Sequence, residues 1–211
     1  MAELAEETGV HIGDGSMNLY SKCGIVSIAG HPKDDKEYYK EYLVPLYEKL
    51  YGVTPRLRHW SRAYGFQVCS TELVQFKNSL GLPLGPKQDI RIPAWIMNSY
   101  SGLKAACLRG IFDTDGTFFV EKKSGGYPRI QIRTTSKGLA EDIHRLLVEM
   151  GFKASKWAEK PGKEGWSIPY AVAVRGKQQI RKWMQEIGTS NPTKKSRYLA
   201  WKKGTNKNES A

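Results

Sequence analysis

The sequence lacks a long apolar run and a recognisable targeting segment. Its first ten residues, MAELAEETGV, carry Glu3, Glu6 and Glu7, where a signal peptide would have basic and then apolar residues. No apolar run approaches the roughly 20 residues that cross a bilayer. We therefore expect a soluble, intracellular protein, in a prokaryotic cytoplasm or an organelle, without a membrane partner.

Cysteine is scarce as well. Cys23, Cys69 and Cys107 lie far apart and form neither a CxxC pair nor a cluster with histidine, which excludes the common zinc sites. Because the count is odd and the spacings are long, a disulfide framework is not indicated. We expect all three to be reduced residues of the core or of strands.

Acidic residues are outnumbered by basic ones. The chain has 33 Lys and Arg against 21 Asp and Glu, a formal net charge of +12, and a sequence pI near 9.5. Such a surplus favours a polyanionic partner, usually nucleic acid, although a solvated basic surface has the same composition. Six Trp and eleven Tyr argue against disorder.

The two halves of the chain follow one plan. GVHIGDGSMNLY in the first half matches RGIFDTDGTFFV in the second, and aligning Gly15 with Gly116 brings Asp14 onto Asp115. Further landmarks follow in the same order, among them the helix-like stretches that end in LYGV and EMGF. Similarity at so long a period indicates a duplicated domain.

Each copy is predicted to run helix, strand, strand, helix, strand, strand, helix. In the second copy the expected helices cover residues 101–112, 138–150 and 177–187, and the expected strands 117–123, 129–134, 153–160 and 170–174. Antiparallel hairpins covered by helices on one side predict an α+β fold, with one sheet per copy and its other face free. The expected domains are residues 1–98 and 99–200, followed by a flexible basic and polar tail at 201–211.

The free face of each sheet is predicted to carry basic and amide side chains. RIQIR alternates strictly, so Arg129, Gln131 and Arg133 point away from Ile130 and Ile132. RLRHWSR has the same alternation. A solvated face mixes both signs of charge, whereas Arg and Gln can contact base edges bidentately, so we expect DNA here. The residues expected to contact DNA are Arg56, Arg58, Trp60, Arg62, Lys122, Arg129, Gln131, Arg133, Lys153 and Lys156.

Two aspartates stand close together in LRGIFDTDGTFFVEKK. Read alone, Asp113 and Asp115 resemble the phosphatase loop of the haloacid dehalogenases, which also needs a later acidic pair for magnesium. Asp142 is the only later aspartate, and the preceding SGLKAACLRGIF has helical spacing. The pair is therefore predicted to end a helix.

Small residues recur four apart on both opening helices. Gly9 and Gly13 have this spacing, and so do Ala106 and Gly110. Residues four apart share one helix face, and a stripe of small side chains allows two backbones to pack closely. We expect these helices to pack against each other, which would bring their terminal aspartates side by side. Such carboxylates repel unless a divalent cation lies between them.

These segments carry a family resemblance. LRGIFDTDG (108–116) resembles the LAGLIDADG signature nearly position for position, and ETGVHIGDG (7–15) resembles a diverged copy of it, with Glu7 in place of the leading leucine and His11-Ile12 in place of Ile-Asp. The chain is similar to a single-chain, two-motif LAGLIDADG homing endonuclease over almost all of residues 1–200.

The resemblance implies a monomer in which two pseudo-symmetric αββαββα repeats, each with a four-stranded sheet, form a saddle over double-stranded DNA and join through the two motif helices. It implies that Asp14 and Asp115 are metal ligands, with Gly13 and Thr114 beside them, and that Asp113 is a structural residue. The implied metal is Mg²⁺, with Mn²⁺ able to substitute and Ca²⁺ supporting binding without cleavage.

Family members also place a lysine near each metal site. By position the candidates are Lys87 and Lys194, with Lys195 a close rival for the second. The polar residue that the family often has at the end of the second strand falls near Gly30 and Thr135. Neither is the usual glutamine, so that role is not carried over.

The implied function is site-specific cleavage of both strands of a long pseudo-palindromic target. The alternative is a non-cleaving nucleic-acid binder of the same fold, such as an intron RNA maturase or a transcription factor. Retention of Asp14 and Asp115 favours the nuclease, while an additional intron RNA partner stays open. The four histidines, His11, His31, His59 and His144, are too scattered in the sequence for an HNH nuclease site.

Overall fold

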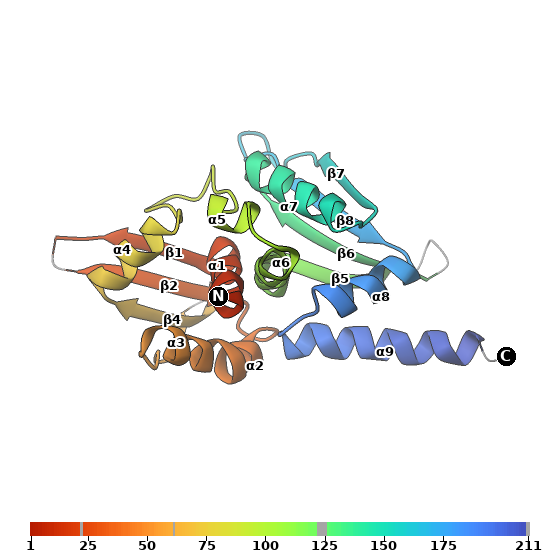
Figure 1. The fold of residues 1–211 in the computed structure, drawn as a ribbon, viewed down its shortest axis with the longest axis horizontal. Helices are drawn as coiled ribbons and strands as arrows, with labels where there is room; N and C mark the ends of the chain where they lie inside the picture. The colour runs from red at the N-terminus through yellow and green to blue at the C-terminus, as the bar shows by residue number, and fades with distance from the viewer. Residues whose placement is uncertain (22, 61, 122–125, 210–211) are drawn as a thin grey trace.

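The computed structural model describes residues 1–21, 23–60, 62–121 and 126–209, which form two repeats of one plan and a C-terminal helix (Figure 1). The first repeat comprises α1 (Ala2–Asp14), β1 (Gly15–Leu19), β2 (Gly24–Gly30), α2 (Lys36–Tyr38), the π-helical turn η1 (Tyr39–Leu43), α3 (Val44–Tyr51), β3 (Arg58–Trp60), β4 (Ala63–Cys69) and α4 (Thr71–Ser79). The short α5 (Ala94–Met97) leads to the second repeat. That repeat comprises α6 (Ser101–Asp115), β5 (Gly116–Glu121), β6 (Tyr127–Thr134), α7 (Lys137–Glu149), β7 (Ala154–Ala158), β8 (Tyr170–Arg175) and α8 (Lys177–Glu186), and α9 (Pro192–Glu209) follows it.

Each repeat forms its own antiparallel sheet. The four strands are ordered β1-β2-β4-β3 in one sheet and β5-β6-β8-β7 in the other. Helices lie on one face of each sheet, and in Figure 1 that face is toward the viewer. These observations confirm the predicted α+β fold and the repeated αββαββα order. The opening helix of the second repeat extends to Asp115, so it includes both aspartates of the motif.

Local sequence signals place the covering helices. The Ser70 hydroxyl accepts a hydrogen bond from the Leu73 amide at 3.0 Å, and the Ser136 hydroxyl accepts one from the Leu139 amide at 3.1 Å. Both are N-caps that satisfy an otherwise unpaired amide of the first helical turn. α3 ends at Gly52, whose φ of 67° is the left-handed conformation that glycine adopts without strain.

The two opening helices, α1 and α6, pack backbone to backbone. A Cβ atom placed on Gly9 would lie 2.1 Å from the carbonyl oxygen of Cys107, and one on Gly110 would lie 2.1 Å from that of Glu6. No side chain fits at either position, which explains the stripe of small residues. The predicted close packing of the opening helices is confirmed, and it joins the repeats at the middle of the molecule (Figure 1).

Residues 201–209, where a flexible tail was expected, continue the helix α9 in the structure. Asn191 caps this helix, since its side-chain oxygen accepts a hydrogen bond from the Thr193 amide at 3.0 Å. Trp201 packs against Phe118 of β5 with their ring centroids 6.0 Å apart. An anchored tryptophan therefore lies where the polar composition had suggested mobile chain.

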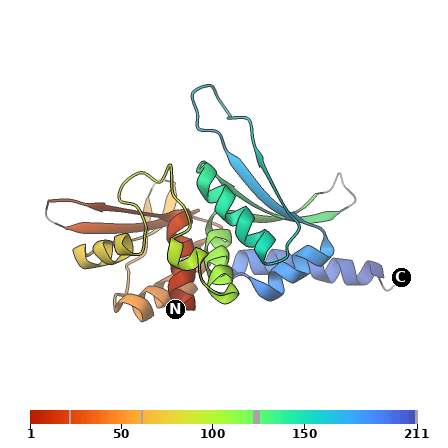
Figure 2. The ribbon, with the colours of Figure 1, turned by 45° about the horizontal axis from the view of Figure 1, so that its top comes forward.

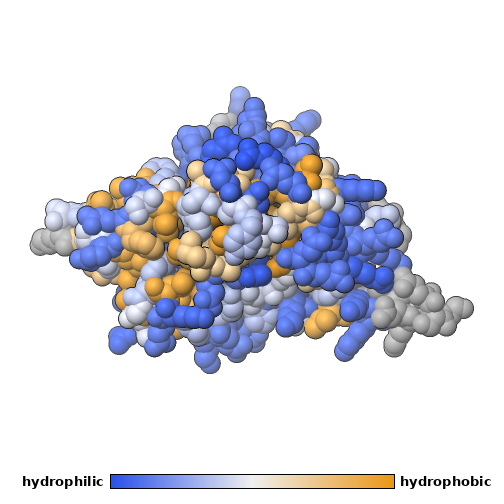
Figure 3. All heavy atoms as spheres, viewed as in Figure 1, coloured by the Kyte–Doolittle hydropathy of each residue, from blue (hydrophilic) through white to orange (hydrophobic). Residues whose placement is uncertain are grey.

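The surface of the helical side differs between the two repeats. In the orientation of Figure 1, hydrophobic residues gather over the first repeat, whereas hydrophilic residues dominate the second (Figure 3). Phe76 and Leu84 of the first repeat are 43% and 40% exposed. Within the described part of the chain, no helix combines the length and the apolar character needed to cross a membrane.

Candidate active site and nucleic-acid interface

Asp14 and Asp115 are the last residues of α1 and α6, at the ends of the packed helix pair. A Cβ atom on Gly13 would lie 2.0 Å from Thr114 Oγ1 and 3.5 Å from the carboxyl carbon of Asp115. The lack of a side chain at Gly13 therefore allows one motif to approach the other. Each carboxylate also lies at the negative end of its helix dipole, which disfavours its charge.

Burial is the main influence on the acidity of Asp14. It raises the pKa of this carboxyl to about 7, and the neighbouring Asp115 and Asp35 act in the same direction. The Tyr39 hydroxyl donates a 2.7 Å hydrogen bond to Asp14 Oδ2 and partly offsets the increase in pKa. A desolvated carboxylate with acidic neighbours is the setting in which a bound cation is most favourable.

Lys87 and Lys194 occupy equivalent places at the two helix ends. Lys87 Nζ donates a 3.0 Å hydrogen bond to the Ile12 carbonyl and a 2.5 Å bond to the Gly13 carbonyl. Lys194 Nζ donates to the carbonyl of Phe112 and, at 3.2 Å, to that of Thr114. Burial lowers the pKa of both ammonium groups, and the nearby aspartates oppose that change.

The two rival lysines of α9 lie in different environments. Lys194 is only 6% exposed and points to the end of α6, whereas Lys195 lies on the exposed side of the helix. Burial raises the pKa of Asp115, and Lys87 and Lys194 lower it. The structure therefore places Lys194 beside the carboxylates and leaves Lys195 outside the site.

Sequence reasoning missed two residues at this site, Asp35 and Tyr39. The Asp35 carboxylate accepts hydrogen bonds from the His31 amide at 2.8 Å and from the Asn191 side chain at 3.1 Å. Tyr39 begins the π-helical turn η1, which directs its hydroxyl to Asp14. Neither residue belongs to a motif, and no local spacing in the sequence indicates their approach to it.

The strand-end position Gly30 also faces Asp14. A Cβ atom there would lie 2.6 Å from Asp14 Oδ2 and 3.0 Å from the Tyr39 hydroxyl. A glutamine side chain would therefore displace the hydrogen-bonded pair. The strand register makes Thr134 the equivalent of Gly30, one residue before the expected Thr135. Both threonines line a hollow of about 330 Å³ together with Asp115.

Asp113 is turned away from the carboxylate pair. It is fully buried and accepts hydrogen bonds from the Thr189 hydroxyl and, at 2.6 Å, from the Ser190 amide. The Asn191 side chain donates a 3.1 Å hydrogen bond to the Asp113 carbonyl. These contacts fasten the end of α6 to the segment between α8 and α9, in keeping with a structural residue.

The donor atoms at the helix ends fit a hard divalent cation. Asp14 and Asp115 provide carboxylate oxygens, and the carbonyls of Gly13 and Thr114 each retain a lone pair beside their lysine hydrogen bond. Among the described residues, no three His, Cys, Asp or Glu side chains converge into a complete metal cage. Magnesium suits so sparse a set of oxygens, because it keeps several waters and binds substrate phosphates.

The free face of the second sheet has the predicted orientation. Ile130 and Ile132 are 1% and 2% exposed on the helical side, and Arg129, Gln131 and Arg133 lie on the other face. Gln131 and Arg133 line a hollow of about 180 Å³ that also contains Asp115. Two of the three predicted base-reading side chains therefore lie next to Asp115.

Neighbouring side chains contact all three of these residues. Arg129 Nη1 donates a 2.7 Å hydrogen bond to Glu121, and its guanidinium lies 4.9 Å from the ring centroid of Trp157. Gln131 donates to Glu159 at 3.2 Å. Arg133 also contacts Glu159, but 64% of its side chain is exposed, so it is the most accessible of the three.

Lys156 lies on the other face of the second sheet from Arg133. It pairs with Val172, which in turn pairs with Ile132, so all three share the helical side. Because side chains alternate along a strand, Lys156 does not lie on the free face, and the prediction that it contacts DNA there is wrong. Lys153 precedes β7 and lines a separate hollow near Arg175. Lys122 lies outside the described residues.

The alternating row of side chains predicted for RLRHWSR is shorter in the structure. Only Arg58 and Trp60 lie within β3, where they pair with Gly65 and Ala63, on the face opposite the core. Arg56 precedes the strand, and Arg62 lies in the turn to β4. The chain reverses after Trp60, so the alternation does not continue along a single strand.

Comparisons with known proteins agree with this architecture. The sequence model of the LAGLIDADG-like domain matches residues 102–188. The chain is 35% identical over 210 residues, 98% of its length, to the replication factor C small subunit of Methanocaldococcus jannaschii. It is 26% identical over 93% of its length to the tRNA-splicing ligase RtcB of Pyrococcus furiosus. It spans only 10% and 22% of these two relatives.

Solved structures of low sequence identity share the fold. The chain superposes on I-DmoI, solved in complex with DNA and Mn, with a TM-score of 0.63 at 17% identity, covering 89% of this chain and 96% of that one. It superposes on the N-terminal LAGLIDADG domain of DUF199/WhiA with a TM-score of 0.55 at 11% identity, covering 89% and 82%. Residues 102–188 therefore form a LAGLIDADG-like domain, and the whole chain has the fold of these structures, with two motif helices that each lead into a four-stranded sheet.

Proposed function

We propose that the protein is a metal-dependent endonuclease that cleaves both strands of a long, pseudo-palindromic DNA target. The observation that carries this proposal is the pairing of Asp14 and Asp115 at the packed ends of α1 and α6, with Lys87 and Lys194 at equivalent places beside them. The two sets of groups, one from each repeat, would serve the two DNA strands.

The carboxylates would hold the metal, together with the carbonyls of Gly13 and Thr114. A bound Mg²⁺ supplies electrophilic activation of the scissile phosphate and of the attacking water, and it stabilises the leaving oxygen. No protein nucleophile is then required. Mn²⁺ is expected to substitute, and Ca²⁺ to support binding without cleavage.

Other groups at the site would position the reactants. Tyr39 donates to one oxygen of Asp14 and so fixes the orientation of that carboxylate. Lys87 and Lys194 carry ammonium groups close to where phosphate oxygens would approach, and they would offset the charge that develops during cleavage. Their hydrogen bonds to the helix-end carbonyls fix their direction.

DNA would lie along the free faces of both sheets. Arg133 is the most accessible base-reading candidate of the second sheet, and Arg58 and Trp60 are its counterparts in the first. Because the faces carry different side chains, the two half-sites would differ in sequence. Both carboxylates come from one chain, so a monomer with repeats at 1–98 and 99–200 would suffice.

The relatives support an activity of the shared segment that differs from the reactions for which these proteins are named. A replication factor subunit and an RNA ligase share no reaction, yet each contains a segment similar to this chain that is a small part of its length. A segment common to such different proteins fits a mobile endonuclease module.

The alternative is a non-cleaving nucleic-acid binder of the same fold, such as an intron RNA maturase. One observation favours it. Lys87 and Lys194 already donate hydrogen bonds to the carbonyls of Gly13 and Thr114, where a metal would gain ligands.

Incubating the protein with a plasmid library of random sequence, with Mg²⁺ or with Ca²⁺, tests the proposal. Sequencing of the ends should recover one related set of sites, cut on both strands with Mg²⁺ and bound but intact with Ca²⁺. Binding of the library without ends in Mg²⁺ or Mn²⁺ would establish the non-cleaving alternative instead. A parallel binding experiment with intron RNA would detect a maturase-like partner.

A further inference from the structure

The two repeats differ in the connection between the last two strands of each sheet. β3 and β4 are joined by residues 61 and 62 alone, whereas β7 and β8 are joined by residues 159–169, called here the β7–β8 arm. The two sheets have the same strand order, so the fold does not require the longer connection. Hairpin loops usually have about 2 to 5 residues, so this connection is unusually long.

The arm presents apolar side chains to solvent. Residues 160–168 are all exposed, and Trp166 and Ile168 are 62% and 47% exposed. An exposed tryptophan offers a large apolar ring with a polar N–H for contact with a partner. The same arm carries Lys160 and Lys163, which can contact phosphates, and Glu159 and Glu164, so its formal net charge is zero.

The tip of the arm has a defined turn. The Trp166 amide donates a 3.2 Å hydrogen bond to the Lys163 carbonyl, and Gly165 has a φ of 81° that glycine adopts without strain. The ammonium group of Lys163 lies 5.6 Å from the centroid of the Trp166 ring. The aromatic ring and a cation are therefore presented together.

The base of the arm lies at the candidate active site. Pro169 lines the same hollow as Asp115 and Lys87. The Glu159 amide donates a 2.7 Å hydrogen bond to the Pro169 carbonyl, and the Glu159 carboxylate accepts one from Arg133. The arm therefore starts beside the side chains proposed to hold metal and to read bases.

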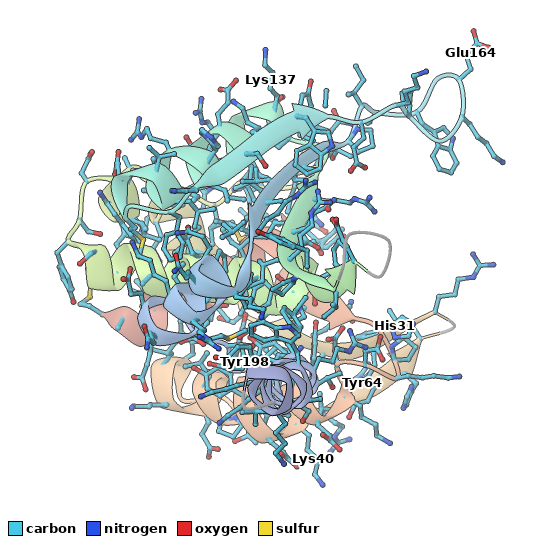
Figure 4. The ribbon with its side chains drawn as sticks, turned by 90° about the vertical axis from the view of Figure 1, so that its right-hand side faces the viewer. His31, Lys40, Tyr64, Lys137, Glu164 and Tyr198 are labelled. Atoms are coloured by element: carbon cyan, nitrogen blue, oxygen red, sulfur yellow. The ribbon has the colours of Figure 1, made fainter. Side chains whose placement is uncertain are left out.

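The arm points to the side where DNA would lie. Figure 2 shows it as a long projection rising from the second sheet. In Figure 4 its tip, marked by Glu164, extends far beyond the body on the side away from α7, which begins at Lys137, and from α9, marked by Tyr198. It therefore reaches past the free face of the sheet.

The geometry of the DNA duplex indicates which groove the arm would meet. If the two sheets enter the major groove of two half-sites one helical turn apart, the minor groove faces the protein between them, at the carboxylates. Apolar side chains in a minor groove commonly wedge between base steps and unstack them. We propose that Trp166, on the β7–β8 arm, inserts at a base step beside the cleaved bonds, with Lys160 and Lys163 on the flanking phosphates. This inference rests on the proposed function.

Permanganate oxidation of thymines that have lost their stacking tests this inference. The probe is a pool of DNA duplexes with randomised centres, bound by the full chain with Ca²⁺ in place of Mg²⁺. Wild-type protein should produce reactive thymines at a fixed position relative to the bonds that Mg²⁺ later allows it to cut. Trp166→Ala should abolish that reactivity and weaken binding roughly tenfold, as loss of one aromatic contact with a base does.

Two variants control for structure. Trp166→Phe keeps an apolar ring and should restore most of the reactivity. Tyr100→Ala removes an aromatic residue that is 65% exposed, at the opposite end of α6 from Asp115, and should behave like wild type. Matching circular dichroism spectra would show that all variants fold.

If Trp166→Ala still produced reactive thymines and bound with wild-type affinity, the inference would be overturned. It would also be overturned if wild-type protein bound and cleaved the pool without producing reactive thymines. Wild-type cleavage of the same pool in Mg²⁺ reports the proposed function separately. Loss of cleavage would contradict the proposed function, whereas loss of thymine reactivity alone would contradict the insertion of Trp166.

Discussion

At the scale of single residues, two adjacent lysines offer a matched comparison. Lys194 is buried against the end of α6, whereas Lys195 is exposed. We predict that Lys194→Ala slows DNA cleavage by roughly 10²-fold, in the range found when one positioned donor is removed from a catalytic site. Lys195→Ala should cleave at the wild-type rate, although it removes the same charge. Single-turnover rates at saturating protein measure both, and equal rates for the two variants would remove Lys194 from the site.

The raised pKa of Asp14 predicts a pH dependence of stability. In the unfolded chain an aspartate loses its proton near pH 4, whereas burial raises the pKa of folded Asp14 to about 7. The folded protein therefore binds a proton that the unfolded chain has lost, and without metal its stability should fall as pH rises from about 4 to about 7. Asp14→Asn should lessen this fall and raise the melting temperature at neutral pH. Urea unfolding across this pH range checks the prediction, which an unchanged slope in the variant would contradict.

Part of the site can be predicted from sequence and part cannot. Asp14 and Asp115 end two matching motifs, so comparing the halves selects both. Lys87 and Lys194 were expected from the family resemblance and their place near the end of each copy, which left Lys195 as a rival. Asp35 and Tyr39 have no such signal, because a π-helical turn directs Tyr39 to Asp14 and Asn191, far along the chain, contacts Asp35.

At the scale of the elements, the packing of α1 against α6 can be tested with two glycines. A Cβ atom at Gly110 would lie 2.1 Å from the Glu6 carbonyl oxygen, whereas one at Gly204 of α9 meets nothing within 4 Å. Gly110→Ala should therefore destabilise the protein by several kcal/mol, because backbone must move. Gly204→Ala should stabilise its helix by up to about 1 kcal/mol. Chemical denaturation compares them, and a neutral Gly110→Ala would argue against backbone contact between the helices.

The alternation along β6 gives a second test at this scale. Arg133 is exposed on the free face, so Arg133→Ala should relax base preference in one half-site, costing about 1 to 3 kcal/mol there. Ile132 is buried on the helical side, so Ile132→Ala should destabilise the fold by roughly 2 to 5 kcal/mol without changing the preferred bases. Cleavage of every single-base variant of the target, together with thermal melts, separates the effects. A changed base profile in Ile132→Ala alone would place DNA on the other face.

Period-two alternation predicted β6 because that strand is long and one face of it is buried. The same pattern failed in RLRHWSR, since β3 ends at Trp60 and Arg62 belongs to the turn. Alternation specifies which side chains share a face, but it does not specify where a strand ends. The helix α9 was missed because its polar composition conceals the contact of Trp201 with Phe118.

At the scale of the whole molecule, the two repeats have diverged around a shared frame. Glu7 replaces the leading leucine of the first motif and is fully buried, yet Tyr47 and Tyr51 donate hydrogen bonds to it at 2.7 Å and Lys77 pairs with it. A buried charge is tolerated when it is paired and hydrogen-bonded. This departure from the signature is therefore accommodated by packing within the first repeat, away from the catalytic groups.

The central claim is that the carboxylates of the two repeats together hold the metal for DNA cleavage. The most direct test measures double-strand cleavage of the recovered target by Asp14→Asn and Asp115→Asn in Mg²⁺, with binding measured in Ca²⁺. Each substitution removes a metal ligand and relieves carboxylate repulsion, so each should abolish double-strand cleavage while affinity stays within about tenfold of wild type. Full cleavage by either variant would contradict the claim.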